Sequence, residues 1–187
     1  MPGRAIAKRC TTTKSVDKRP FAAGVRAGIE RFTDLTGRAT SWLVLVIVVL
    51  MASNVLLRYL FSYGTVWAQE LEWHLLAPLI LFGMSYALLH GEHVRVDVLY
   101  GNFPPRMKFY VDLLSSALSV AISAIIIWLS LKYVQQAYVI GEQSSDPGGL
   151  PYRWLLKALI PTGFLFLILQ SVALMLATLD KLKALRK

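Results

Sequence analysis

The sequence is poor in the residues that build covalent and metal-based sites. It has one cysteine, Cys10, and three histidines among 187 residues. A single cysteine excludes a disulfide within the chain, and no apolar run precedes Cys10 to indicate a lipid anchor. Zinc sites usually combine several cysteines and histidines, so the composition gives no support to one. Neither a disulfide scaffold nor a cysteine-rich metal site is expected.

Charged residues are missing from four long stretches. No Asp, Glu, Lys or Arg occurs over 19, 19, 19 and 22 residues, in Ala39–Leu57, Trp73–Gly91, Leu113–Leu131 and Ala158–Leu179. About 20 apolar residues cross roughly 30 Å of hydrocarbon as a helix. Four such helices buried in a soluble protein would be unusual, so we expect an all-α membrane protein with four transmembrane helices. A membrane domain at 39–180 would hold spans at about 39–61, 69–91, 109–137 and 153–179.

The N-terminal segment lacks the short apolar core and small-residue cleavage site of a signal peptide. Residues 1–20 are basic and polar, and we expect them to form a disordered tail. Residues 21–38 are predicted to form a short amphipathic helix at the bilayer surface. Its apolar residues recur at helical spacing, as Val25, Ile29, Phe32 and Leu35. Residues 181–187 would form a second basic tail, on the cytoplasmic side.

Acidic residues are outnumbered by Lys and Arg, 11 to 20. The basic residues gather in blocks between the apolar runs instead of covering one face of a soluble domain, which argues against nucleic-acid binding. Sixteen of the 20 fall in residues 1–38, 92–108 and 180–187. These segments lie on one side if the chain crosses four times. The positive-inside rule then places both termini in the cytoplasm.

The centres of the four spans lack acidic and basic side chains. Transporters that move an ion or anion by themselves usually place charged groups or broken helices near the bilayer midplane. A self-sufficient four-helix channel or exporter is therefore the weaker alternative. Ser115, Ser119 and Ser123 recur at every fourth position of the third span. Small residues at this spacing favour helix packing over a conduction path.

The densest group of potential ligands follows the second span, where His90, Glu92, His93 and Asp97 lie within eight residues. All three histidines lie on this span or just after it. His74 precedes His90 by 16 residues, about 24 Å along a helix, so the two cannot share one iron. We interpret the cluster as a helix exit into the cytoplasm and expect no metal, cofactor or catalytic residue. A membrane anchor of an electron-transfer complex stays open as a second alternative.

The residues from Arg58 to Leu99 also match the sequence pattern of a known family. The segment RYLFSYGTVWAQELEWHLLAPLILFGMSYALLHGEHVRVDVL resembles the small membrane subunit of tripartite ATP-independent periplasmic (TRAP) transporters. The matching positions are Arg58, Tyr59, Phe61, Trp67, Glu70, His93, Arg95, Val96 and Asp97. The later segment PYRWLLKALIPTGFLFLILQ resembles the family's fourth span. The likeness covers about residues 35–180.

The resemblance implies an accessory role rather than an enzymatic one. In this family a large permease subunit carries the substrate and sodium sites, and a periplasmic protein captures the solute, often an organic acid. The small subunit packs on the large one and offers periplasmic surface to the binding protein. The resemblance thus implies two protein partners, of which the binding protein is a transient one. It also implies that this chain lies in the bacterial inner membrane. Membrane lipids would surround the bundle, and no nucleic acid is expected as a partner.

Arg58 and Glu70 are expected to form a structural charge pair. Arg58 follows the first apolar run and Glu70 opens the second helix after a short loop, so both lie at similar depth. A lone guanidinium at the edge of the hydrocarbon is costly, and a carboxylate nearby would relieve that cost. Glu72 lies about 200° around the helix from Glu70, so only one of them faces the first span. The family pattern favours Glu70 and leaves Glu72 to solvent or a partner subunit.

Overall fold

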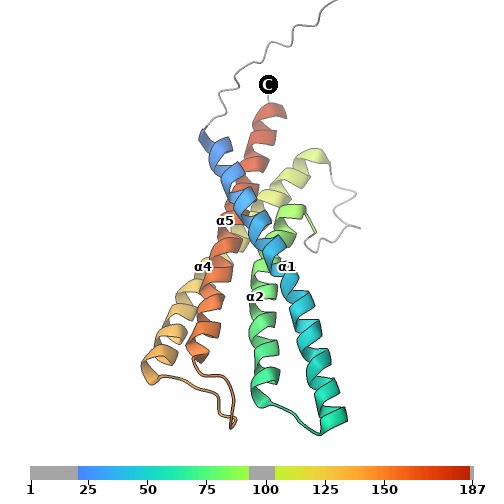
Figure 1. Cartoon of the computed structure of the whole chain (residues 1–187). Helices are drawn as coiled ribbons and strands as arrows, with labels where there is room; N and C mark the ends of the chain where they lie inside the picture. The colour runs from blue at the N-terminus through green and yellow to red at the C-terminus, as the bar shows by residue number, and fades with distance from the viewer. Residues whose placement is uncertain (1–20, 93–103, 186–187) are drawn as a thin grey trace, which may run out of the picture.

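The computed structural model describes residues 21–92 and 104–185. These residues form four helices, α1 (Phe21–Phe61), α2 (Val66–His90), α4 (Pro105–Ile140) and α5 (Arg153–Leu185) (Figure 1). Each contains a stretch long and apolar enough to cross a membrane. The described residues include no strand. The prediction of an all-α protein with four membrane-spanning helices is confirmed.

The helix ends follow from local sequence. Gly91 and Gly141 end α2 and α4 with φ of 76° and 63°, the left-handed conformation that glycine adopts at low cost. Pro105 begins α4, where a missing N–H is harmless because no carbonyl precedes it in the helix. Proline also lies within α2 and α5, at Pro78 and Pro161. Each helix thus contains one charge-free run, and turn-forming residues mark the ends of α2 and α4.

The predicted surface helix and the first span form one continuous helix. Residues 21–38 are helical, as their periodicity indicates, and α1 continues through to Phe61 over 41 residues. That length corresponds to roughly 60 Å, about twice the hydrocarbon thickness. Gly37 lies within this helix, and the Tyr86 side chain of α2 packs so close to it that a Cβ would have no room. The placement of residues 21–38 at the bilayer surface stays a prediction.

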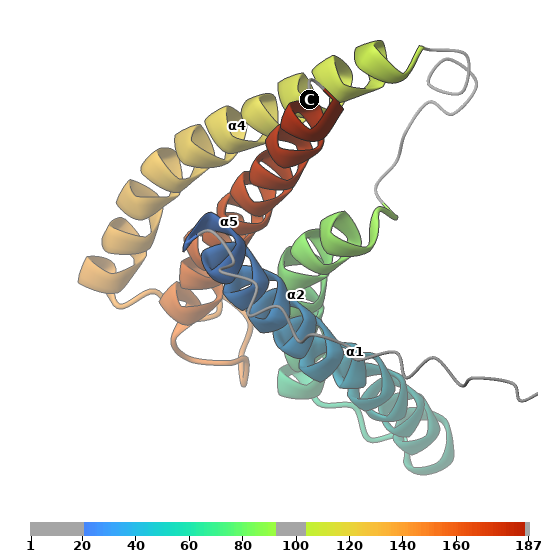
Figure 2. The ribbon, with the colours of Figure 1, turned by 90° about the horizontal axis from the view of Figure 1, so that it is seen from above.

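The helices are arranged in space as α1, α2, α5 and α4. Helix α5 packs against all three others, most extensively against α4, while α1 packs on α2 and to a smaller extent on α5. Seen from above, α4 and α5 lie on one side of the molecule, and α1 crosses over α2 (Figure 2). The loops at residues 62–65 and 141–152 lie together at one end, which we call the loop end (Figure 1). The start of α1 and the end of α5 lie at the opposite end.

Helices α4 and α5 meet through small side chains. Buried residues of α4 recur every seven positions, at Ser116, Ser123, Ser130 and Ala137. A seven-residue repeat keeps one face toward a neighbouring helix, and small residues let two backbones approach closely. Of the predicted stripe, Ser123 is 1% exposed and Ser119 Oγ lies 3.0 Å from Ser171 Oγ of α5.

Ser115 lies outside this face. Its side chain is exposed and donates a hydrogen bond to the carbonyl of Asp112 at 3.0 Å. The physical reason is geometric: each step of four residues advances about 400°, so a four-residue stripe drifts by about 40° per step. Ser116 takes the buried position instead, and is 3% exposed. The predicted packing stripe is thus shifted by one residue at its first position.

Candidate functional site

Glu70 lies at the centre of a polar cluster at the loop end. Its carboxylate extends from the second turn of α2 and is 11% exposed. Oε1 accepts hydrogen bonds from the Ser144 hydroxyl and from Nη2 of Arg153, the latter at 3.2 Å. Oε2 accepts from the backbone N–H of Leu150 at 2.6 Å. One carboxylate on α2 therefore binds both the 141–152 loop and the first residue of α5.

The 141–152 loop is also held by bonds of its own. The N–H of Gly149 donates to the Asp146 carbonyl at 3.0 Å, and the N–H of Arg153 donates to the Glu142 carbonyl at 3.3 Å. The N–H of Asp146 donates to Ser144 Oγ at 3.2 Å. Gly149 allows close approach, because a Cβ at this position would lie 2.7 Å from Glu70 Oε2. We call Glu70, Ser144, the Leu150 N–H and Arg153 the Glu70 clamp.

A second polar contact connects α4 to α5 beside the clamp. The Lys157 ammonium forms an ion pair with Glu142 and lies 3.8 Å from the centre of the Tyr133 ring. Tyr138 and Trp154 meet edge to face, with their centroids 5.4 Å apart. A desolvated ammonium over an aromatic face gains electrostatic stabilisation from the ring. The loop end therefore joins α2, α4, α5 and the 141–152 loop through polar contacts.

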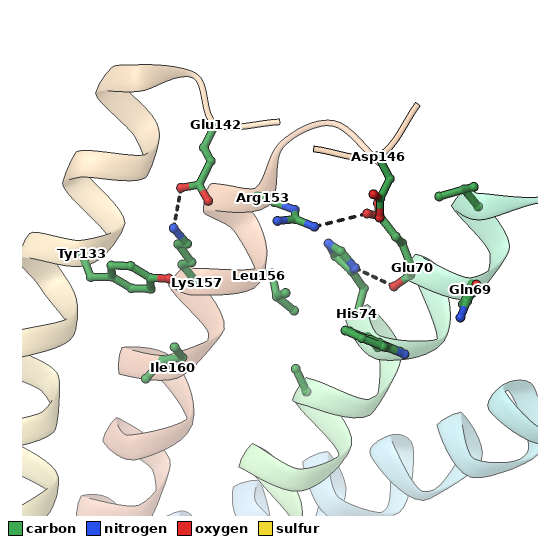
Figure 3. A pocket seen from close by; sticks show the side chains of 13 residues that line it. Gln69, Glu70, His74, Tyr133, Glu142, Asp146, Arg153, Leu156, Lys157 and Ile160 are labelled. Carbon is green, nitrogen blue, oxygen red and sulfur yellow. Dashed lines mark hydrogen bonds and ion pairs between the residues drawn. The ribbon is translucent and has the colours of Figure 1, made fainter. Parts of the chain in front are cut away.

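Between these contacts lies a cavity of about 550 Å³ (Figure 3). It is bounded by α2, α4, α5 and the loop, and it carries charged groups beside apolar ones. His74 contributes its ring: Nδ1 lies 2.7 Å from the Glu70 carbonyl oxygen. The opposite nitrogen, Nε2, is buried and has no hydrogen-bond partner among the described residues. This leaves one ring nitrogen available for a further hydrogen bond.

The structure does not bring Arg58 and Glu70 together. Arg58 is exposed at the end of α1, and the ion-pair partner of Glu70 in the described chain is Arg153. The reason is the face of α2 that each residue occupies. Ala68 lines an apolar groove shared with α1, and Glu70 lies about 200° further round, toward α5. In the described chain Glu70 therefore pairs with Arg153 of α5 and not, as predicted, with Arg58.

Three other residues of the family pattern lie on the surface at the loop end. Tyr59, Phe61 and Trp67 are exposed, by 84%, 71% and 48%. Their side chains therefore face the surroundings of the chain more than its interior. The remaining pattern residues lie outside the residues that the structure describes: His93, Arg95, Val96 and Asp97.

At the opposite end His90 contacts α1. Its Nε2 lies 3.8 Å from Asp34 Oδ1, and Asp34 Oδ2 also pairs with Arg38 Nε at 3.0 Å. The Tyr86 ring packs on His90 with centroids 4.3 Å apart. Within residues 21–92 and 104–185, no three His, Cys, Asp or Glu side chains form a group suited to a metal ion. His90 joins two helices here, while His93 and Asp97 of the predicted cluster fall in the undescribed segment.

Four helices, each long and apolar enough to cross a membrane, define a multi-pass membrane protein. A family model described as "Tripartite ATP-independent periplasmic transporters, DctQ component" matches residues 33–181, which include all of α2 and α4, most of α5 and the part of α1 from residue 33 onward. The chain belongs to this family. It is thus a small permease component of the TRAP type, and its relatives are transporter subunits rather than enzymes. The resemblance seen in the sequence is confirmed.

Two curated relatives illustrate the similarity. The chain is 32% identical over 81 residues to the C4-dicarboxylate TRAP transporter small permease protein DctQ of Vibrio cholerae serotype O1 (strain ATCC 39315 / El Tor Inaba N16961). It is 33% identical over 113 residues to the protein of the same description from Rhodobacter capsulatus. The matched stretches cover 43% and 60% of this chain, and the chain spans only 35% and 48% of the relatives' length.

Proposed function

We propose that this chain is the accessory membrane subunit of a TRAP-type secondary transporter. In this role it packs on a large permease subunit and supports sodium-coupled uptake of a C4-dicarboxylate or related organic acid, delivered by a periplasmic binding protein. The observation that carries the proposal is the family match over residues 33–181. The described relatives are small permeases of C4-dicarboxylate transporters, which supports the substrate class.

The distribution of charge supports an accessory role. The four runs without any Asp, Glu, Lys or Arg fall mostly in the second half of α1, in α2 from Trp73 to its end, and in the middle of α4 and α5. The described ionisable contacts lie toward the helix ends, at the Glu70 clamp, at Lys157 and at the Asp34–His90 contact. A chain that moved an organic anion alone would need a polar or charged site near the midplane. We therefore assign substrate and sodium binding to the large subunit.

The exposed surface of α1 supports packing on a larger subunit. The most apolar window of this helix has none of its residues buried within the chain. Val48, Val49 and Met51 are each more than half exposed. Lipid can cover such a surface, and so can the scaffold of a membrane partner. We propose that the 42–61 half of α1 faces the large subunit, while the loop end meets the binding protein.

Reconstitution tests the proposal directly. Proteoliposomes holding this chain and its large subunit, supplied with the binding protein and an inward sodium gradient, are expected to accumulate radiolabelled succinate or its cognate organic acid. Omitting any one component should abolish uptake. Succinate flux through liposomes that contain this chain alone would contradict the accessory role and favour a self-sufficient channel.

A further inference from the structure

The cavity at the loop end changes in character with depth. Its rim carries the charged residues Glu70, Glu142, Asp146, Arg153 and Lys157. Its apolar lining includes Ala77, Leu156 and Ile160. Helices α2 and α5 both run away from the loop end, so residues later in each helix lie deeper. Ala77 and Ile160 therefore form the deeper wall, so the cavity is polar at its rim and apolar in its depth.

Polar groups at the rim can form further hydrogen bonds, some as donors and others as acceptors. Arg153 gives one bond from Nη2 to Glu70, and a guanidinium has five N–H donors. His74 Nε2 is buried without a partner in the described chain. Glu142 engages Lys157 through Oε2, and Asp146 is exposed on the loop. A ligand that carries both an acceptor and a donor matches this set.

The charges at the rim favour a zwitterion over an anion. Three carboxylates face two cations, so the formal sum is negative. An anionic head group would add a second excess negative charge, which is unfavourable where water is partly excluded. An ammonium can instead donate hydrogen bonds to carboxylates, whereas a quaternary choline cannot. The chemistry therefore selects a phosphate with a primary ammonium close by.

We infer that this cavity binds the head group and upper acyl segment of phosphatidylethanolamine. Arg153 and His74 bind its phosphate, Asp146 and Glu142 accept hydrogen bonds from its ammonium, and the acyl chain lies along Ala77, Leu156 and Ile160. The cavity is lined by the ends of membrane-spanning helices, so a lipid reaches it from the bilayer. The inference does not depend on the transport role, because it uses only contacts within this chain (Figure 3).

Native mass spectrometry of the full chain, delipidated in detergent, tests the inference. Titration with phosphatidylethanolamine is expected to give one retained lipid, with at least about fivefold preference over phosphatidylcholine and phosphatidylglycerol; fivefold corresponds to roughly 1 kcal/mol. Ala77→Trp fills the deep wall and should remove that lipid. Ala124→Trp, at an exposed alanine of α4, is the matched control and should retain it.

A second variant addresses the head group without touching the bundle. Asp146→Asn lies on an exposed loop position and should reduce the preference for phosphatidylethanolamine over phosphatidylglycerol while leaving the thermal unfolding unchanged. Equal retention of all three lipids, or unchanged retention in Ala77→Trp, would overturn the inference. Equally tight binding of soluble glycerophosphoethanolamine would also overturn it, because the acyl chain would then contribute nothing.

Discussion

Three hydrogen-bond donors converge on Glu70, from Ser144, Leu150 and Arg153. Bonds to an ionised acceptor are stronger than bonds between neutral groups. Removing the carboxylate leaves the Leu150 N–H and the Arg153 guanidinium without this acceptor in a partly buried place. Removing Arg153 instead leaves the carboxylate with two donors. The two substitutions should therefore not have independent effects.

A double-mutant cycle checks this coupling. Glu70→Ala and Arg153→Ala should each lower the unfolding temperature of the purified chain by a few degrees, and the double variant should lose less than the sum. Arg58→Ala is the control and should change little, because Arg58 is exposed and makes no ion pair with Glu70. Additive losses for Glu70 and Arg153, or a large loss for Arg58→Ala, would contradict the clamp.

The Glu70 clamp shows which side-chain contacts cannot be predicted from the sequence. The motif residues identified Glu70, and its position in the first turns of a helix was readable from the sequence. Its cation lies 83 residues further along the chain, and the order of helices in space decides that pairing. Arg58 was the nearer cation in sequence, but α1 packs on a different face of α2. The turn-rich SSDPGGLPYR segment was the available signal for a structured loop.

At the scale of helices, the packing of α2 on α5 depends on one glycine that lets the two helices come close together. Gly163 of α5 faces Leu81 of α2, and a Cβ added there would lie 2.6 Å from the Leu81 Cβ. Such a contact is shorter than carbon atoms allow, so the helices would have to separate. Phe82, the residue after Leu81, packs against Phe166 of α5, with the ring centroids 5.0 Å apart. Glycine at 163 therefore sets the distance between these helices.

Two glycine substitutions separate packing from helix propensity. Gly163→Ala should destabilise the bundle by about 1–3 kcal/mol, the usual cost of overpacking. Gly83→Ala is the matched control, because its Cβ would meet nothing within 4 Å. Alanine there should leave the stability unchanged or raise it by up to about 1 kcal/mol. Thermal or denaturant unfolding in detergent measures both; equal effects would show that the Leu81 contact is unimportant.

The exclusion of charge from hydrocarbon indicates where the helices lie along the chain, but not how far each extends or which face it turns to its neighbours. The expected span at 69–91 corresponds to α2 at Val66–His90, and the one at 109–137 lies within α4 at Pro105–Ile140. The packing role of Ser115, Ser119 and Ser123 stays a prediction, and Ser116 rather than Ser115 is buried. The rotation of a face depends on how two helices coil around each other, and the sequence of one helix does not determine it.

For the whole molecule, the charge bias predicts that the loop end faces the periplasm. Labelling of single cysteines in a Cys10→Ser background measures this in intact cells. Gly64→Cys and Ser145→Cys should react with a membrane-impermeant maleimide, since both positions are exposed. Asn102→Cys should react only after permeabilisation. Labelling of Asn102→Cys in intact cells would show that the orientation is opposite to the proposed one. The loop end would then lie in the cytoplasm, where a periplasmic binding protein could not reach it.

The distance in sequence between Glu70 and Arg153 also has a consequence for biogenesis. The chain is synthesised from its N-terminus, so α2 enters the membrane 83 residues before the cation that completes the clamp. At ribosomal rates that interval lasts on the order of 4–17 seconds. During it, the carboxylate of the nascent hairpin has to be kept in contact with water, lipid head groups or the insertion machinery. Arg153 belongs to α5, so the Glu70 clamp can be completed only after this helix has been synthesised.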